Sequence, residues 1–154
     1  MKYFIIAILS VFALAGCKNN GQKSSQVKSV EAPAAVPSFE LKEIIVGTLK
    51  KPLPKPNFQV LNMSVEKDVL NVVVSYSGGC EEHEFNGYFS GGWAKSLPPQ
   101  ASIEFEHLNP NNDACRSMVK DTLRFNAKPL QFPGANEVIV KWSANSKVQT
   151  SYTY

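Results

Sequence analysis

After residue 38 the chain repeatedly alternates apolar and polar side chains, as β-strands with one buried face do. This pattern predicts strands at 39–47, 57–68, 69–77, 83–91, 101–108, 117–126, 136–143 and 146–154. Turn signals such as "KKPLPKPN", "SLPPQ" and "FPGAN" separate them. About eight strands at this spacing predict an all-β domain over residues 38–154, an antiparallel two-sheet β-sandwich of immunoglobulin-like type, with a barrel as the alternative.

The amino terminus has a different pattern. "MKYFIIAILSVFALAGC" places one lysine before an apolar run that ends in small residues and Cys17. The run is too short for a stable membrane span and has the layout of a secretory signal peptide, which we assign to residues 1–16. The ending "LAGC" resembles the bacterial lipobox, and this resemblance implies that Cys17 is lipidated and anchors the protein to a membrane.

Residues 17–37 are polar or small and contain no aromatic side chain. Such a segment cannot bury enough surface to offset its chain entropy, so we expect a flexible tether. Lys18 follows Cys17 where enterobacterial lipoproteins of the inner membrane carry aspartate. By resemblance to that rule, we expect the protein to lie on the outer membrane and face the periplasm.

Charge adds little to this picture. Four of the 16 basic residues and one of the 13 acidic residues precede residue 38, so the domain itself is electrically balanced. A balanced domain lacks the basic footprint of a nucleic-acid-binding protein, and we expect no nucleic-acid partner.

With Cys17 taken by lipid, Cys80 and Cys115 are the two remaining thiols in an oxidising compartment. We therefore expect a disulfide between them. In the chain-entropy model such a bond contributes roughly 3 to 4 kcal/mol.

The two histidines offer an alternative. Strand alternation places His83 on the face of Phe85, and His107 on the face of Ile103 and Phe105, so both imidazoles point towards the core. Two thiolates and two imidazoles, from Cys80, His83, His107 and Cys115, would suit tetrahedral zinc or a copper centre. This metal site requires reduced thiols, which the periplasm disfavours.

A catalytic function has less support. Cys115 could act as a nucleophile with His107 as its base, but in an oxidising compartment it would be lost to a disulfide with the second cysteine. The alternating glutamates are typical of a solvated sheet face, and no serine-hydrolase, zinc-protease or phosphate-loop motif is present. We therefore do not expect an enzyme.

The stretch "FNGYFSGGWAKSLPPQ" gathers aromatic residues among glycines. Exposed aromatics of this kind favour recognition, so Tyr88, Phe89 and Trp93 are the candidate binding residues. The alternative is that Trp93 packs over the end of the sandwich.

The segments "YSGGCEEHEF", "SLPPQASIEFEHLNPNNDAC" and "DTLRFN" resemble a pattern of small bacterial lipoproteins, some of them grouped as NigD-like. This resemblance, over residues 76–126, implies a β-sandwich envelope protein in which Cys80, His83, His107, Asp113 and Cys115 form one local cluster. It implies no activity. The function expected from the sequence is a lipid-anchored, non-catalytic module that binds an envelope protein, peptide or glycan, and the alternative is a metal-binding lipoprotein.

Overall fold

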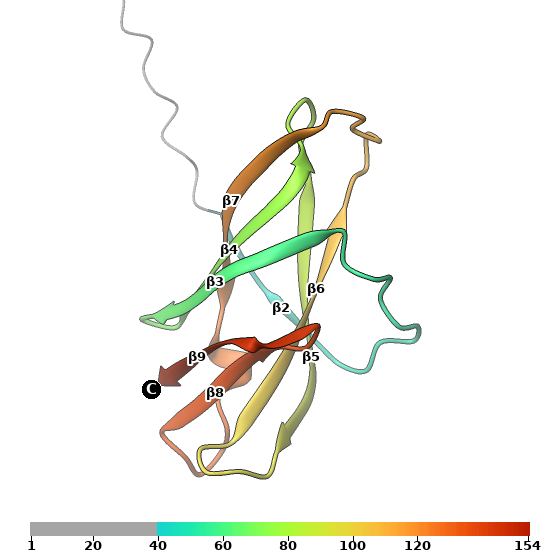
Figure 1. Ribbon diagram of the computed structural model, residues 1–154. Coiled ribbons are helices and arrows are strands. Elements are labelled where there is room, and N and C mark those ends of the chain that lie inside the picture. Colours follow the sequence, from blue (N-terminus) through green and yellow to red (C-terminus); the bar gives the residue numbers. More distant parts are fainter. Residues whose placement is uncertain (1–39) are drawn as a thin grey trace, which may run out of the picture. The chain divides into compact units, whose positions relative to one another are not determined.

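The alternation of apolar and polar residues builds two packed sheets. The computed structural model describes residues 40–154, and all of its regular structure is strand except one short 3-10 helix (Figure 1). The elements are β1 (Leu41–Lys42), β2 (Ile44–Val46), β3 (Phe58–Glu66), β4 (Val69–Gly78), β5 (Glu84–Ala94), β6 (Gln100–Leu108), β7 (Ser117–Asn126), η1 (Lys128–Leu130), β8 (Glu137–Trp142) and β9 (Asn145–Thr153). The predicted all-β sandwich is confirmed.

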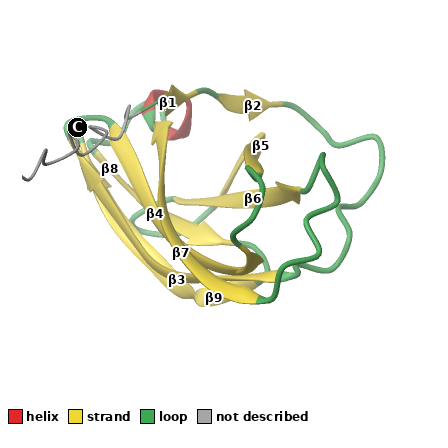
Figure 2. Cartoon of the chain, turned by 90° about the horizontal axis from the view of Figure 1, so that it is seen from above, coloured by secondary structure: helices red, strands yellow, loops and turns green. Residues whose placement is uncertain are grey.

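The two sheets are mixed, not purely antiparallel. One has the strand order β1-β7-β4-β3 and the other β2-β5-β6-β8-β9, and Figure 2 shows the two layers from above. The pairs β1–β7, β2–β5 and β6–β8 are parallel. The expectation of antiparallel pairing throughout is wrong at these three places. From β6 the chain crosses to β7 in the other sheet and then returns, so β8 runs in the same direction as β6.

The single strand expected at 39–47 is instead two short strands. The chain changes sheet at Glu43, so β1 extends the edge at β7 and β2 extends the edge at β5. The Glu43 carboxylate accepts hydrogen bonds of 3.3 and 3.0 Å from Asn126 Nδ2 at this crossing. Ile44 lies directly after it, is buried, and pairs with Gly87. Alternation alone does not show such a change of sheet, because both short strands keep the period of two.

The core fills the space between the sheets with the inward residues of eight strands, β2 to β9. β4 contributes every second residue from Leu70 to Tyr76, and β6 contributes Ala101, Ile103 and Phe105. Each fully buried large apolar side chain contributes about 1.5 to 3 kcal/mol relative to leaving it in water. The inward face that the sequence predicts for β6, with Ile103 and Phe105, is confirmed.

The turn between β3 and β4 fastens the two sheets together at one end. Lys67 and Asp68 both have positive φ, 46° and 65°, as a two-residue hairpin turn requires. Asp68 Oδ1 accepts a hydrogen bond of 2.5 Å from the Tyr152 hydroxyl in the opposite sheet, and Asp68 O accepts one of 2.8 Å from Ala127 N–H. These hydrogen bonds hold Asp68 in the turn, so it keeps a positive φ where such a turn usually has glycine.

The predicted signal peptide (1–16), the lipidated Cys17 and the tether (17–37) lie outside the described residues and stay predictions. Within residues 40–154, no helix has the length and apolar character to cross a membrane.

Candidate functional sites

Cys80 and Cys115 form a disulfide, with their Cα atoms 5.9 Å apart. The bond joins the turn after β4 to the loop before β7, and both lie at the top of Figure 1. The predicted disulfide is confirmed. Two of the four side chains in the alternative zinc or copper constellation are therefore bonded to each other and are not available as thiolates.

The fold also brings the two histidines together. A hydrogen bond of 2.7 Å joins His83 Nδ1 to His107 Nε2, and the rings lie nearly parallel with an interplanar angle of 18°. Two nitrogens on tetrahedral zinc lie roughly 3.3 Å apart, given Zn–N distances of about 2.0–2.1 Å. In this geometry the imidazoles bond to each other at a distance too short for a zinc ion held by these two nitrogens.

Asp113 completes this cluster from the loop before β7. Its carboxylate lies 3.2 Å from His83 Nε2, and both side chains are 1% exposed. It also accepts backbone N–H bonds from Cys115 at 2.8 Å, from Cys80 at 3.0 Å and from Glu81 at 3.1 Å. These donors, Cys115 N–H first, hold the pKa of Asp113 far below its usual range, so the carboxylate is ionised.

The loop geometry explains the sequence "NPNND". Asp113 N–H donates to Asn109 Oδ1 at 2.7 Å, and Asn109 Nδ2 donates back to Asp113 O at 3.2 Å. Between them Asn112 adopts a positive φ of 51°, which asparagine tolerates better than most residues. The asparagines therefore shape the loop that carries Asp113 to His83.

We call His83, His107 and Asp113 the histidine clasp. Aromatic rings of Phe58, Tyr76 and Phe85 surround its imidazoles. Burial lowers the pKa of His107 below its ordinary value, and charge on His83 lowers it further. The clasp and the disulfide tie β5, β6 and the loop before β7 into one unit, which is a structural task.

The predicted binding aromatics have three different surroundings. Phe89 is fully buried, so its expected place on a recognition surface is wrong. Trp93 packs against Phe89 and Phe132, and its indole N–H donates to Leu130 O at 2.9 Å. The expected alternative, that Trp93 packs over an end of the sandwich, matches this arrangement. Tyr88 alone points to the outer face of β5 and lines a cavity.

This cavity has a volume of about 640 Å³ and lies between β5, β6 and residues 47–57, which we call the strap. The strap leaves β2 at the edge of one sheet and returns as β3 in the other, on the right of Figure 1. Pro52, Pro54 and Pro56 restrict its backbone to extended conformations. The strap and the sheet surface beneath it form the strap pocket.

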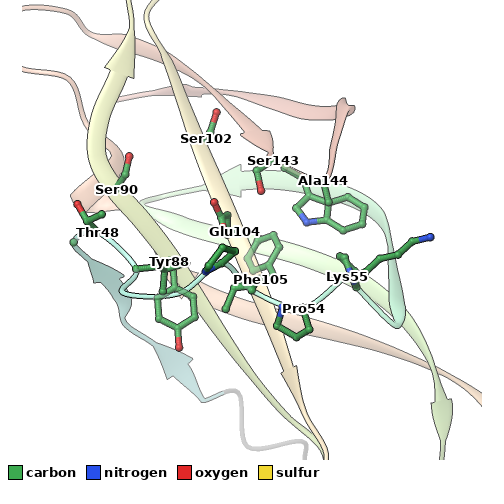
Figure 3. A pocket seen from close by; sticks show the side chains of 16 residues that line it. Thr48, Pro54, Lys55, Tyr88, Ser90, Ser102, Glu104, Phe105, Ser143 and Ala144 are labelled. Atoms are coloured by element: carbon green, nitrogen blue, oxygen red, sulfur yellow. The ribbon is translucent and has the colours of Figure 1, made fainter.

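Polar side chains of β5 and β6 line the floor of the strap pocket (Figure 3). Tyr88 and Glu104 are directly opposite each other in the antiparallel pair. The Tyr88 hydroxyl donates to Glu106 Oε2 at 2.7 Å, and this bond, with burial, raises the pKa of Tyr88. Ser90 and Ser102 provide two further hydroxyls. Within residues 40–154, the Glu104 side chain makes no hydrogen bond or ion pair, so its carboxylate can accept from a ligand.

Sequence reasoning missed this pocket, because "KKPLPKPN" reads as a turn signal. Its length and its three prolines do indicate an ordered strap, since most connections between strands are only about 2–5 residues long.

No protein-family model matches this chain, and no curated protein matches its sequence. Solved structures similar to it include a protein of unknown function, DUF1344, from Bacteroides vulgatus, with 16% identity and a TM-score of 0.49. That match covers 74% of this chain and 56% of the other. A NigD-like immunity protein from Bacteroides caccae has 12% identity and a TM-score of 0.49, covering 66% of this chain and 52% of the other. This chain thus spans little more than half the length of either neighbour.

Proposed function

We propose that the protein is a lipid-anchored, non-catalytic module of the bacterial cell envelope that binds a short neutral glycan in the strap pocket. The anchor at Cys17, the periplasmic location and membership of the NigD-like lipoproteins are parts of this proposal that rest on the sequence alone. The observation that carries the binding function is the strap pocket, whose volume of about 640 Å³ falls in the range of small-molecule sites.

The chemistry of the lining favours a ligand rich in hydroxyl groups. Ser90, Ser102 and Thr48 each offer a hydroxyl that donates and accepts, and the unpaired Glu104 carboxylate accepts only. A sugar offers many O–H donors, and a carboxylate forms stronger hydrogen bonds with them than a neutral acceptor does. Its C–H faces can pack on the ring of Tyr88 and on the prolines of the strap.

The same lining supports binding without hydrolysis. Glycoside hydrolysis uses two carboxyl groups on either side of the bond, about 5 to 9.5 Å apart. Among residues 40–154, Glu104 is the one acidic residue that lines the strap pocket. The histidines are held in the clasp, where they bond to each other and His83 bonds to Asp113.

The test is a calorimetric titration of the full chain, exported and purified in detergent, with N-acetylchitotriose and, separately, maltotriose. We expect at least one sugar to bind. The substitutions Glu104→Ala and Tyr88→Ala should each weaken that binding about tenfold or more, equal to about 1.4 kcal/mol. Both replace partly exposed side chains of the outer face, so each variant should keep the wild-type melting temperature to within a few degrees.

Leu61→Ala is the matched control, because Leu61 is also an exposed strand residue and does not line the strap pocket. Its affinity should equal that of the wild type. The proposal is wrong if neither sugar binds at millimolar concentration, or if the two pocket variants bind as well as the control.

A further inference from the structure

A second hollow opens beside the disulfide, at the end of the sandwich where β4 gives way to the loop before β5. Its volume is about 530 Å³. Its lining includes Tyr76 from β4, Glu81 and Glu82 from the loop, and Asp121 from β7. We call these four residues the acidic mouth. It shares no lining residue with the strap pocket.

The charge of the mouth is one-sided. Three of its four named side chains are carboxylates, and no lysine or arginine lines the hollow among the described residues. His83 also borders the hollow, but its Nε2 bonds to Asp113 and its Nδ1 to His107. The hollow therefore has a negative potential that attracts cations.

Tyr76 provides an independent indication of a ligand. The residue is 8% exposed, and its ring packs against both imidazoles and Phe85. Its hydroxyl makes no hydrogen bond to any of residues 40–154, so it is free to bond a ligand. No fully buried side-chain oxygen in that part of the chain lacks a partner, so the exposed tip of Tyr76 is this hydroxyl, which reaches the hollow.

The spacing of the carboxylates indicates what kind of cation fits. Ca²⁺ binds about 6–8 oxygens at 2.3–2.6 Å, so its ligand atoms must lie within about 5 Å of one another. In residues 40–154 the one group of acidic, histidine and cysteine side chains with ligand atoms within 4.8 Å of one another is Cys80, Asp113 and Cys115. The carboxylates of the mouth do not converge on one point, which argues against a bare metal ion.

We propose that the acidic mouth binds a primary alkylammonium group, with the Tyr76 hydroxyl and the Asp121 carboxylate accepting its N–H bonds. An ammonium carries three donors and no acceptor, which matches a set of carboxylates with one hydroxyl. In a diamine, the alkyl chain separates two ammonium groups, so that each can reach a different carboxylate of the mouth. The group can belong to a free diamine or to a lysine side chain.

The test is a calorimetric titration of the full chain in detergent at pH 7.5 and low salt, with cadaverine and Nα-acetyl-lysine methylamide as separate probes. We expect cadaverine to bind, and Asp121→Asn and Tyr76→Phe each to weaken it about tenfold. Tyr76→Phe keeps the ring between the histidines and removes only the hydroxyl. Stronger binding of the lysine derivative than of cadaverine would identify a lysine side chain as the source of the group, and the reverse a free diamine.

Glu66→Gln is the control, because Glu66 is an exposed acidic residue beside the β3–β4 turn. Three results would overturn the proposal: no binding of either probe, equal weakening by Glu66→Gln and Asp121→Asn, or Mg²⁺ alone binding as tightly as cadaverine. Because the two sites share no lining residue, the sugar titration is unaffected by Asp121→Asn, and either site can fail without the other.

Discussion

The imidazole of His83 lies almost parallel to that of His107, with ring centroids 4.9 Å apart and a hydrogen bond of 2.7 Å between the two rings. Asp113 lies on the far side of His83, at 3.2 Å from Nε2. An ionised Asp113 only accepts, so the Nε2–H of His83 donates to it, and at the other end of the pair His107 Nδ1–H donates to Asn57 Oδ1 at 2.8 Å. Residues from four separate segments thus share one hydrogen-bond chain.

Stability should fall as the pH falls through two ranges. His107 has a pKa lowered from 6.5 and Asp113 one lowered from 3.8, so the folded chain binds fewer protons than the unfolded chain below each ordinary value. The stabilisation is complete above pH 6.5, and part of it is lost as the pH falls from there through the folded pKa of His107. The rest is lost below pH 3.8.

Urea unfolding at pH 7.5, 5.5 and 3.0 measures this dependence. The decrease between pH 7.5 and 5.5 should be smaller in His107→Gln, which has no proton to gain there. A stability that rises between pH 7.5 and 5.5 would contradict the assignment of His107 as a neutral, partly buried ring.

Removing the disulfide should destabilise the domain strongly. The variant Cys80→Ser/Cys115→Ser is expected to lose roughly 3 to 4 kcal/mol of unfolding free energy, because the unfolded chain regains the freedom of a long loop. The wild type in a thiol reductant should match the variant in a urea titration followed by circular dichroism. If reduction leaves the midpoint unchanged, the bond contributes nothing to stability.

Gly78→Ala should disturb the clasp directly. A Cβ at Gly78 would lie 2.6 Å from His83 Nε2 and 3.1 Å from Asp113 Oδ2, so the imidazole would have to move. We expect a loss of about 1 to 3 kcal/mol in thermal or urea unfolding. At Gly92 the nearest atom to an added Cβ is Ser90 Oγ at 3.8 Å, so Gly92→Ala is the control and should change stability far less.

Phe89→Ala should act as a core substitution and not as a surface one. The fully buried ring contacts Trp93 with centroids 5.1 Å apart, and its removal should cost about 3 to 5 kcal/mol. Trp93→Phe should cost less, because it keeps an aromatic ring and loses part of the indole packing and the hydrogen bond to Leu130 O. Differential scanning calorimetry distinguishes the two. If both substitutions lower the stability by the same small amount, Phe89 is a surface residue and not a core residue.

Cys17→Ser should release the protein from the membrane. Stable anchoring by lipid needs more than one acyl chain, because a single chain binds a membrane only marginally. Cys17 is the residue expected to carry these chains, so the variant loses its membrane anchor. After cell fractionation the wild type should lie in the outer-membrane fraction and the variant in the soluble fraction. A variant that stays with the outer membrane would disprove lipid anchoring at Cys17.

The strands themselves were predictable because each is determined by local alternation. The predicted strand at 69–77 appears as β4, Val69–Gly78, and the predicted strand at 117–126 has the bounds of β7. The disulfide was predictable for a different reason, because only two thiols remain once Cys17 is assigned to lipid. Neither inference needed knowledge of which strands are neighbours.

The strap pocket and the contact between the histidines were not predictable in the same way. Alternation showed that His83 and His107 face inward, but not that the antiparallel register of β5 and β6 places Phe85 opposite His107 and leaves His83 to bond to it. The pocket depends on the strap crossing from one sheet to the other, and no local pattern encodes that path.

From the sequence alone come the strands, their buried faces, the disulfide and the expected anchor, because each depends on short-range periodicity, residue chemistry or a local motif. The resemblance implied that the histidines and Asp113 cluster, but the tertiary structure alone decided their contacts, the mixed pairing, the burial of Phe89 and both hollows. Those features arise where segments far apart in the chain come into contact. Such contacts are stabilised by the packing of the two sheets against each other, which no single segment determines.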